Sequence, residues 1–259
     1  MHTSIDKLLV TGDSLTDNRL EWIRLLNHHH HWADIVSQQI DAEYVNTGIA
    51  GELIKNIADN IQERILQYNP THVIFDGGIN DIERGVEESV VLYSIEFVLI
   101  VLYESNIKPI YFVSPAASRT VIETYGSGTL EFISKYIKLY PQILKMMARY
   151  KDCEFIDLCT TALGPIYDVD KQYFVDTLHY SQAGESLVAG KMIEHIEKYY
   201  SIQDIPENTT SLPQGQILVN YTNHQPLYIK VGSKYKPLVI RNEGVQNTTE
   251  AVASIKWRC

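Results

Sequence analysis

The feature that most constrains the fold is an alternation, over residues 7–200, of short apolar runs with longer segments of helical periodicity. The short runs are rich in Val, Ile and Tyr and predict strands, whereas apolar residues that recur every three or four positions predict helices. Strands that alternate with helices favour a parallel sheet covered on both faces. The expected strands are Lys7–Thr11, Glu43–Asn46, His72–Phe75, Pro109–Val113 and Glu154–Leu158, and the expected helices are Trp32–Ile40, Leu53–Tyr68, Val86–Ser105, Leu130–Tyr150 and Gln182–Tyr200, with Ser181 as N-cap of the last.

The segment Gly12-Asp13-Ser14 follows the first expected strand directly. Taken alone it is typical of a turn that ends a strand, because Gly, Asp and Ser are all common in turns. In an open parallel sheet, however, functional groups gather at the carboxyl ends of the strands. Ser14 therefore has two interpretations, a turn residue or a nucleophile.

A nucleophilic serine needs a base, since a free hydroxyl is almost wholly protonated near neutral pH. Asp176 and His179 lie three residues apart, just before the last helix, where a carboxylate could orient an imidazole. Asn80 follows the third strand in a glycine turn, and its amide could donate to an oxyanion. Without the other groups, His179 would be an ordinary surface histidine and Asn80 an ordinary turn residue.

These residues fall into four blocks that occur in the order found in a known family. The chain resembles the SGNH hydrolases, also called GDSL-type esterases and lipases. Each block alone is a weak signal, but four in order over roughly residues 7–200 are a strong one. The blocks are Gly12-Asp13-Ser14-Leu15-Thr16-Asp17, Asn46-Thr47-Gly48-Ile49-Ala50-Gly51, Gly78-Ile79-Asn80-Asp81 and Asp176-Thr177-Leu178-His179.

The resemblance implies a flavodoxin-like three-layer α/β/α fold with a five-stranded parallel sheet. It also implies a catalytic triad of Ser14, His179 and Asp176. The implied oxyanion hole consists of the Ser14 N–H, the Gly51 N–H and the Asn80 side chain. Gly51 is preferred to Gly48 because the family's glycine follows a small residue, here Ala50.

Two positions depart from the family pattern. Asn18 stands where a glycine is common, and because Asn tolerates left-handed backbone the turn is expected to survive. Tyr180-Ser181 follows His179 where the family commonly has Pro or Asn. Neither change touches the reacting groups.

No metal or organic cofactor is expected. His28–His31 are consecutive and cannot converge on one ion, so a polar loop leading into the helix at Trp32 is the preferred interpretation. Asp13, Asp17 and Asp81 are expected in turn and cap roles rather than as ligands. Cys153 and Cys159 are expected to be buried thiols on one face of a strand, and the odd count completed by Cys259 argues against a disulfide framework.

The net charge of −10 argues against a nucleic-acid partner or an anionic membrane surface. The most apolar stretch, residues 86–103, is interrupted by Glu87, Glu88 and Glu96, so it indicates a buried helix and not a membrane span. No signal-peptide pattern follows Met1, which favours a cytoplasmic location unless a signal has been removed.

The chain is expected to divide into a catalytic domain at 1–203 and a small β-rich module at 212–259, joined by a polar, proline-marked linker. Strands in the module are expected at Gln216–Tyr221, Leu227–Val231, Lys236–Arg241 and Val252–Trp257. A module this small is expected to pack on the main domain or on another subunit, the latter giving a homo-oligomer.

The predicted function is that of a serine esterase that forms an acyl-enzyme, with short-chain O-acyl esters of carbohydrate, above all acetyl esters, as the first choice of substrate. The sequence leaves a lipase or thioesterase, or an O-acyltransferase, open on the same triad. A catalytically silent protein that binds glycan or mediates assembly is the alternative from another class.

Overall fold

The computed structural model of the chain describes residues 3–19, 30–114, 127–150, 153–163, 171–176, 178–200, 228–231 and 234–237. Its centre is a five-stranded sheet in the order β2-β1-β3-β4-β5, in which every neighbouring pair is parallel. The strands are β1 (Lys7–Thr11), β2 (Glu43–Asn46), β3 (His72–Phe75), β4 (Lys108–Val113) and β5 (Glu154–Asp157). The predicted five-stranded parallel sheet is confirmed, and three of its strands, β1, β2 and β3, match their predicted bounds at both ends.

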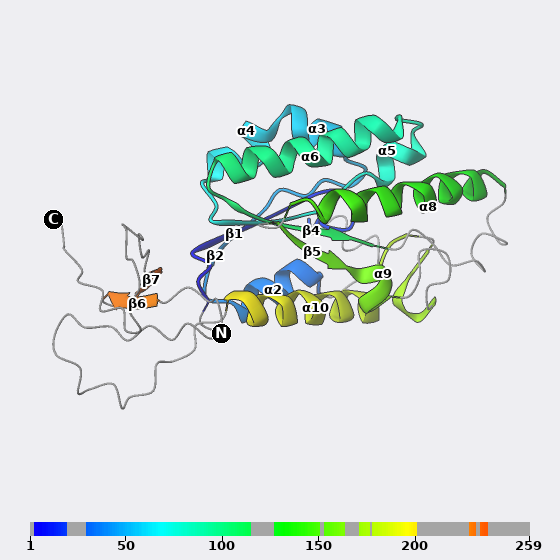
Figure 1. The fold of residues 1–259 in the computed structure, drawn as a ribbon. Coiled ribbons are helices and arrows are strands. Elements are labelled where there is room, and N and C mark those ends of the chain that lie inside the picture. The colour runs from blue at the N-terminus through cyan, green and yellow to red at the C-terminus, as the bar shows by residue number, and fades with distance from the viewer. Residues whose placement is uncertain are drawn as a thin grey trace, which may run out of the picture.

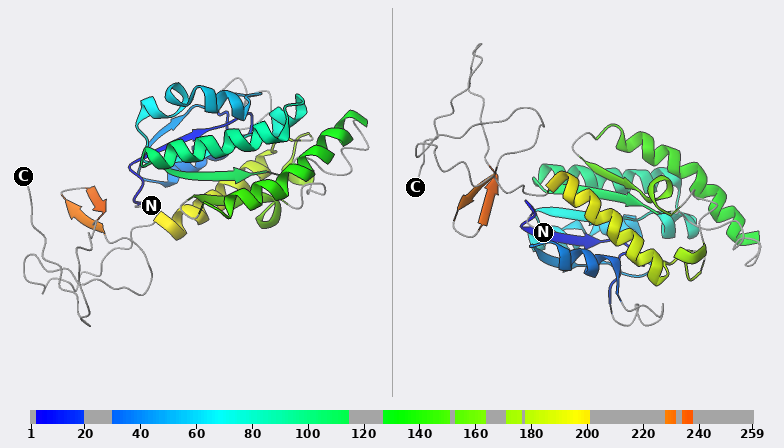
Figure 2. Two further views of the ribbon diagram at one scale, coloured as in Figure 1. Left: turned by 45° about the horizontal axis from the view of Figure 1, so that its top comes forward. Right: turned by 90° about the horizontal axis from the view of Figure 1, so that it is seen from below.

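Helices cover both faces of this sheet, which gives three layers (Figure 1). One face carries α3 (Ile54–Asp59), α4 (Ile61–Arg64), α5 (Ile79–Glu83), α6 (Glu88–Glu104) and α8 (Ser127–Met147). The other carries α2 (Trp32–Gln39) and α10 (Gln182–Tyr200), which lie in front of the strands when the sheet is seen from below (Figure 2). Three short elements complete the described part of this domain: η1 (Leu66–Tyr68), α9 (Leu158–Thr161) and η2 (Lys171–Tyr173).

The alternation of side chains along each strand divides the interior into two cores. In β1, Leu9 packs with α3 and α6, whereas Leu8 and Val10 pack with α2 and α10. All three are fully buried. Because both faces of the sheet are covered, these strands read as continuous apolar runs rather than as alternating ones.

The predicted helix Leu53–Tyr68 is wrong as a single element. The chain leaves helical geometry at Asn60 (φ −116°, ψ 29°) and again at Ile65 (φ −133°, ψ −62°), which separates α3, α4 and η1. The apolar periodicity continues across both breaks, because Ile61 and Leu66 still pack against the core that contains Ile57 and Ile65. The apolar side chains on this face therefore stay packed against the core, although the backbone departs from helical geometry at two residues.

The other differences lie at element ends. The helix α8 begins and ends three residues before the predicted Leu130–Tyr150 and contains Pro141, while α5 replaces part of the expected glycine turn. Cys153 precedes β5 and Cys159 lies in α9, so the expectation that one strand carries both is wrong. Both are free thiols; burial raises the pKa of Cys153 to about 12 and that of Cys159 further.

Within the predicted C-terminal module, the structure describes an antiparallel pair, β6 (Tyr228–Val231) and β7 (Lys234–Pro237). The expected strand at 227–231 is confirmed to within one residue, whereas β7 begins two residues before the expected 236. The expected strands at 216–221 and 252–257, the linker and Cys259 lie outside the described residues. None of the helices in the described part of the chain is both long and apolar enough to cross a membrane.

Candidate active site

The turn that presents Ser14 starts where β1 ends. The carbonyl of Asp13 accepts the N–H groups of Thr16 and Asp17 at 3.1 and 3.0 Å, which closes a tight turn around the serine. Gly12 has φ +150°, and a Cβ there would lie 1.7 Å from Oδ1 of Asp76. Only glycine fits at this position, because the neighbouring strand's carboxylate occupies the space that a side chain would need.

The structure brings Ser14, His179 and Asp176 into one hydrogen-bonded chain, although Ser14 and His179 are 165 positions apart. The Oγ of Ser14 lies 3.0 Å from Nε2 of His179, and Nδ1 of the same ring lies 2.6 Å from Oδ2 of Asp176. A carboxylate can only accept, so the proton on Nδ1 is assigned to this bond, which leaves Nε2 as the acceptor for the serine hydroxyl. This is the geometry that activates a hydroxyl nucleophile.

Asp176 is held ionised by its own loop. Burial works against the charge, but bonds from the ring and the backbone N–H of His179 prevail and lower the pKa of the carboxyl below its usual value. Oδ1 accepts the N–H groups of Leu178 and His179 at 2.8 and 2.7 Å, while Oδ2 faces the imidazole. The carboxylate thus fixes both the loop and the ring with separate oxygens.

Two of the groups expected to donate to an oxyanion each have an N–H without a hydrogen-bond partner among the described residues. The buried side chain of Asn80 donates one amide N–H to the carbonyl of Glu52 at 3.1 Å, which orients the amide and leaves its second N–H. Gly51 has φ +77°, and its N–H has no hydrogen-bond partner among the described residues. A glycine is required at that φ, and an unpaired N–H is what an oxyanion hole needs.

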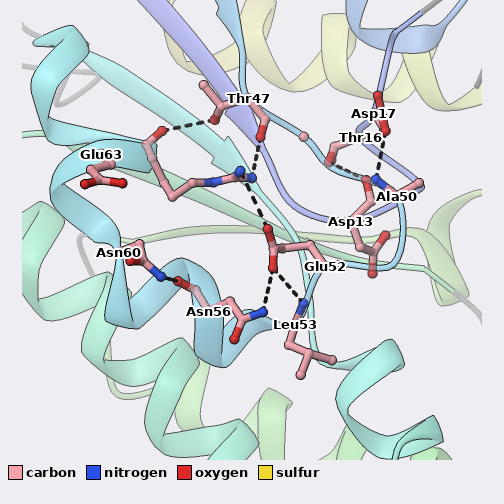
Figure 3. A network of polar contacts seen from close by, with 12 residues as sticks. Asp13, Thr16, Asp17, Thr47, Ala50, Glu52, Leu53, Asn56, Asn60 and Glu63 are labelled. Carbon is pink, nitrogen blue, oxygen red and sulfur yellow. Dashed lines mark hydrogen bonds and ion pairs between the residues drawn. The ribbon is translucent and has the colours of Figure 1, made fainter. Parts of the chain in front are cut away.

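The turn that contains Ala50 and Gly51, called the glycine turn below, is connected to the turn that contains Ser14 by several long-range hydrogen bonds. Oδ2 of Asp17 accepts the N–H of Ala50 at 2.8 Å (Figure 3). Nδ2 of Asn46 donates to the carbonyl of Thr16 at 2.8 Å. On the other side of the turn, Glu52 accepts from the side chain of Asn56 at 2.8 Å. These bonds fix Gly51 relative to Ser14 before any substrate is present.

A pair of buried carboxyl groups lies beside the turn that contains Ser14. Oδ1 of Asp13 accepts the N–H of Leu15 at 2.9 Å, and Oδ1 of Asp76 accepts the N–H of Asp13 at 3.3 Å. Burial raises the pKa of Asp13 to about 6. Burial, together with the charge of Asp13, raises that of Asp76 well above its usual value. Two carboxyl groups that face each other in a buried site disfavour each other's ionisation, and the pKa of each is raised.

The helix α2 supports the serine turn from the second face of the sheet. Nε1 of Trp32 donates to the carbonyl of Leu15 at 2.6 Å, and the backbone N–H of Trp32 donates to the buried Glu185 of α10 at 2.7 Å. Sequence patterns missed Asp76, Trp32 and Glu185 as supports of this turn. A carboxyl directly after a strand end was a usable signal for Asp76, but nothing local in the sequence marks the other two.

The remaining sequence predictions are resolved as follows. The turn around Ser14 forms as expected, although Asn18 does not adopt left-handed backbone; its Nδ2 donates to Asp34 at 2.5 Å. Asp81 caps the start of α3 by accepting the N–H of Ile54 at 2.9 Å, as expected of a cap residue. His31 caps α2 through Nδ1, which accepts from Ala33 at 3.2 Å, while His28 and His29 lie outside the described residues.

Comparison with known proteins shows the family to which this arrangement belongs. A family model described as the GDSL-like lipase/acylhydrolase family matches residues 10–187, which is more than half of the chain. The chain belongs to this family. A GDSL-like lipase/acylhydrolase is a hydrolase, so the expected enzyme class is confirmed. None of the curated proteins matches the chain in sequence.

Solved structures share the fold of this GDSL-like acylhydrolase at low sequence identity. The lipase/acylhydrolase from Enterococcus faecalis superposes with a TM-score of 0.59 at 17% identity, covering 76% of this chain and 98% of its own. An acetylxylan esterase from Geobacillus stearothermophilus gives 0.56 at 18%, covering 76% and 95%. A GDSL-like lipase from Bacteroides thetaiotaomicron gives 0.56 at 18%, covering 74% and 88%. At these identities the likeness shows the fold alone.

Proposed function

We propose that this acylhydrolase is a serine esterase in which Ser14 is the nucleophile, His179 the general base and Asp176 the residue that orients it. The observation that carries the proposal is the continuous chain of contacts from Ser14 Oγ to His179 at 3.0 Å and from His179 to Asp176 at 2.6 Å. A hydroxyl that is hydrogen-bonded to the unprotonated nitrogen of an imidazole can transfer its proton to that nitrogen as its oxygen attacks a carbonyl.

The reaction proceeds in two steps. Ser14 Oγ attacks the ester carbonyl while Nε2 of His179 takes its proton, and the tetrahedral oxyanion is bound by the N–H groups of Ser14 and Gly51 and the amide of Asn80. His179 then gives the proton to the leaving alcohol, which forms the acyl-enzyme and the free alcohol. Water, deprotonated by the same imidazole, hydrolyses the acyl-serine and regenerates the hydroxyl.

The proposed substrates are short-chain O-acyl esters of carbohydrate, with acetyl as the acyl group. The acidic chain lacks a long apolar lid in its sequence, which does not favour a long acyl chain. The fold is also that of a protein named as an acetylxylan esterase, although that likeness alone does not determine a substrate. The C-terminal module, residues 212–259, is proposed to hold the polysaccharide that carries the ester.

The test is a pair of measurements on wild type and Ser14→Ala. A fluorophosphonate probe should label wild type and not the variant, and hydrolysis of aryl acetates should fall by about 10³-fold or more when the nucleophile is removed. Labelling that is equal in both proteins would reject Ser14 as the nucleophile. An acyl-length series from acetyl to decanoyl then tests the substrate class, since rates that rise with length would favour a lipase or thioesterase instead.

A further inference from the structure

A cationic side chain lies beside the proposed oxyanion hole and takes no part in the steps above. Arg84 follows α5, and its backbone N–H donates to the carbonyl of Asn80 at 3.0 Å. Residues four apart in a helical turn share one face, so Asn80 and Arg84 project to the same side. Asn80, which carries the proposed oxyanion amide, and Arg84 therefore come from α5 and its C-terminal cap.

The same face of α5 packs against the glycine turn. The amide of Asn80 contacts the carbonyl of Glu52, and a Cβ placed on the adjacent Gly51 would lie 3.1 Å from Nη2 of Arg84. The guanidinium thus lies over the residue whose unpaired N–H is the second proposed oxyanion donor. A substrate whose carbonyl oxygen reaches that N–H brings its nearest substituents close to Arg84.

Arg84 differs from the other cations near this edge of the sheet. Arg19 pairs with Asp17, Arg64 with Glu52 and Lys55 with Asp59. Arg84 is exposed, and no carboxylate of the described residues lies within ion-pair distance of it. Its charge acts at longer range on the buried Asp81, where it lowers a pKa that burial raises overall.

An exposed arginine is usually just solvated, and most surface cations need no further explanation. Arg84 stands out because its charge is unneutralised in a chain of net charge −10 and because it lies over a predicted reaction centre. A planar guanidinium with its donors free matches a carboxylate or phosphate through two parallel hydrogen bonds. Without the charge of Arg84, the carboxyl group of Asp81 would disfavour an anionic ligand here.

We propose that Arg84 binds an anionic substituent of the substrate, so that the preferred esters are those of acidic molecules that carry a carboxylate or phosphate close to the ester group. This inference rests on the proposed esterase function and narrows its substrate class. Arg84 would be a specificity residue, since it binds the substituent and not the reacting atoms. A neutral ester should therefore depend little on Arg84.

The test uses matched acetate esters that differ in one charge. The 2-, 3- and 4-acetoxybenzoates are compared with the corresponding acetoxybenzamides, because the three isomers place the carboxylate at different distances from the ester. The proteins are wild type, Arg84→Gln, Arg84→Lys and Arg149→Gln. Arg149 is a matched control, since it follows α8 and precedes β5 and so lies at the opposite edge of the sheet.

In Arg84→Gln, kcat/KM for at least one benzoate should fall about 10- to 100-fold relative to its benzamide, as expected for the loss of a charged hydrogen-bonded contact. Arg84→Lys should retain part of the preference, and Arg149→Gln all of it. An unchanged benzoate-to-benzamide ratio for all three isomers would overturn the inference. An equal fall for both series would assign Arg84 to the oxyanion instead and overturn it as well.

The benzamides separate this inference from the esterase proposal. Hydrolysis of a benzamide ester by wild type but not by Ser14→Ala supports the esterase whatever Arg84 does. Wild type that hydrolyses neither series at any isomer would reject the esterase proposal itself, and with it the role of Arg84.

Discussion

The two sides of the candidate site are held in different ways. The serine side, which comprises residues 12–17 with Gly51 and Asn80, is fixed by long-range contacts from β3, α2 and the glycine turn. The hydrogen bonds that shape the histidine side, residues 173–176 and 178–181, are mostly local, while its Phe174 and Tyr180 pack in the core beside α2 and α10. Asp176 bonds to its own loop, Val175 N–H donates to the carbonyl of His179 at 2.9 Å, and Phe174 bridges Tyr180.

This difference has a physical consequence. A nucleophile and its oxyanion donors must be placed to within a fraction of an ångström, and rigid strands with several partners hold that placement. A base needs to reach the serine and keep one tautomer, which a local carboxylate provides. Changes to the polar groups of the histidine side should therefore affect rate more than stability, whereas changes on the serine side should affect both.

The largest expected effect is that of His179→Ala. Loss of the proposed base should lower kcat by about 10⁴-fold or more, since triad members act as a unit. The free energy of unfolding should change by less than about 1 kcal/mol, because the backbone N–H of His179 can still bond to Asp176. Ester hydrolysis and urea unfolding measured on one preparation test both parts. A large loss of stability would contradict the conclusion that local backbone hydrogen bonds shape the histidine side.

Asn80→Ala should have the next largest effect. Removing one oxyanion donor should lower kcat by about 10²- to 10³-fold with little change in KM. The carbonyl of Glu52 also loses its donor, so the variant should unfold about 1 kcal/mol more easily. Asn56→Ala serves as control, since this exposed amide contacts the Glu52 side chain away from Gly51. Equal kcat values for the two variants would remove Asn80 from the oxyanion hole.

Asp76→Asn should stabilise the protein, and more so as the pH rises. The raised pKa values of Asp13 and Asp76 mean that the folded form binds more protons than the unfolded form, so wild-type stability falls as pH rises through about 4 to 6 and beyond. Asparagine keeps the acceptor for the Asp13 N–H but cannot ionise, so one of the two groups with a raised pKa is removed.

Urea unfolding at pH 5 and pH 8 measures the effect of Asp76→Asn, which should be about 1–3 kcal/mol more stable than wild type at pH 8 and less so at pH 5. The exposed Asp59→Asn is the control and should show no such trend. A gain that is the same at both pH values would mean that the two carboxyl groups do not share a proton.

The smallest expected effect is that of Asn18→Gly, which restores the residue common in the family. Because Asn18 is not left-handed, glycine relieves no strain, and the bond to Asp34 is lost. The variant should be less stable by about 0.5–1.5 kcal/mol, with activity within a few-fold of wild type. Thermal unfolding measures this, and a rise in the melting temperature would show that the turn does favour glycine.

The strands of the sheet, and the functional groups that lie close together in the chain, could be predicted from the amino-acid sequence. Buried strands such as His72–Phe75 carry their signal in consecutive apolar residues, and Asp176 and His179 lie close enough in the chain to meet through one turn. The positions of Ser14, Asn80 and Gly51 at strand ends also follow from parallel topology, because all carboxyl ends meet at one edge.

The residues that support those groups could not be predicted from the sequence and are known only from the folded structure. Asp76 lies 63 residues beyond Asp13, and Trp32 lies 17 beyond Leu15, so neither contact has a local pattern. The break of the helix at Asn60 and Ile65, the true role of Asn18 and the place of Arg84 over Gly51 depend in the same way on packing. Such contacts depend on the space left between elements, which periodicity and spacing do not encode.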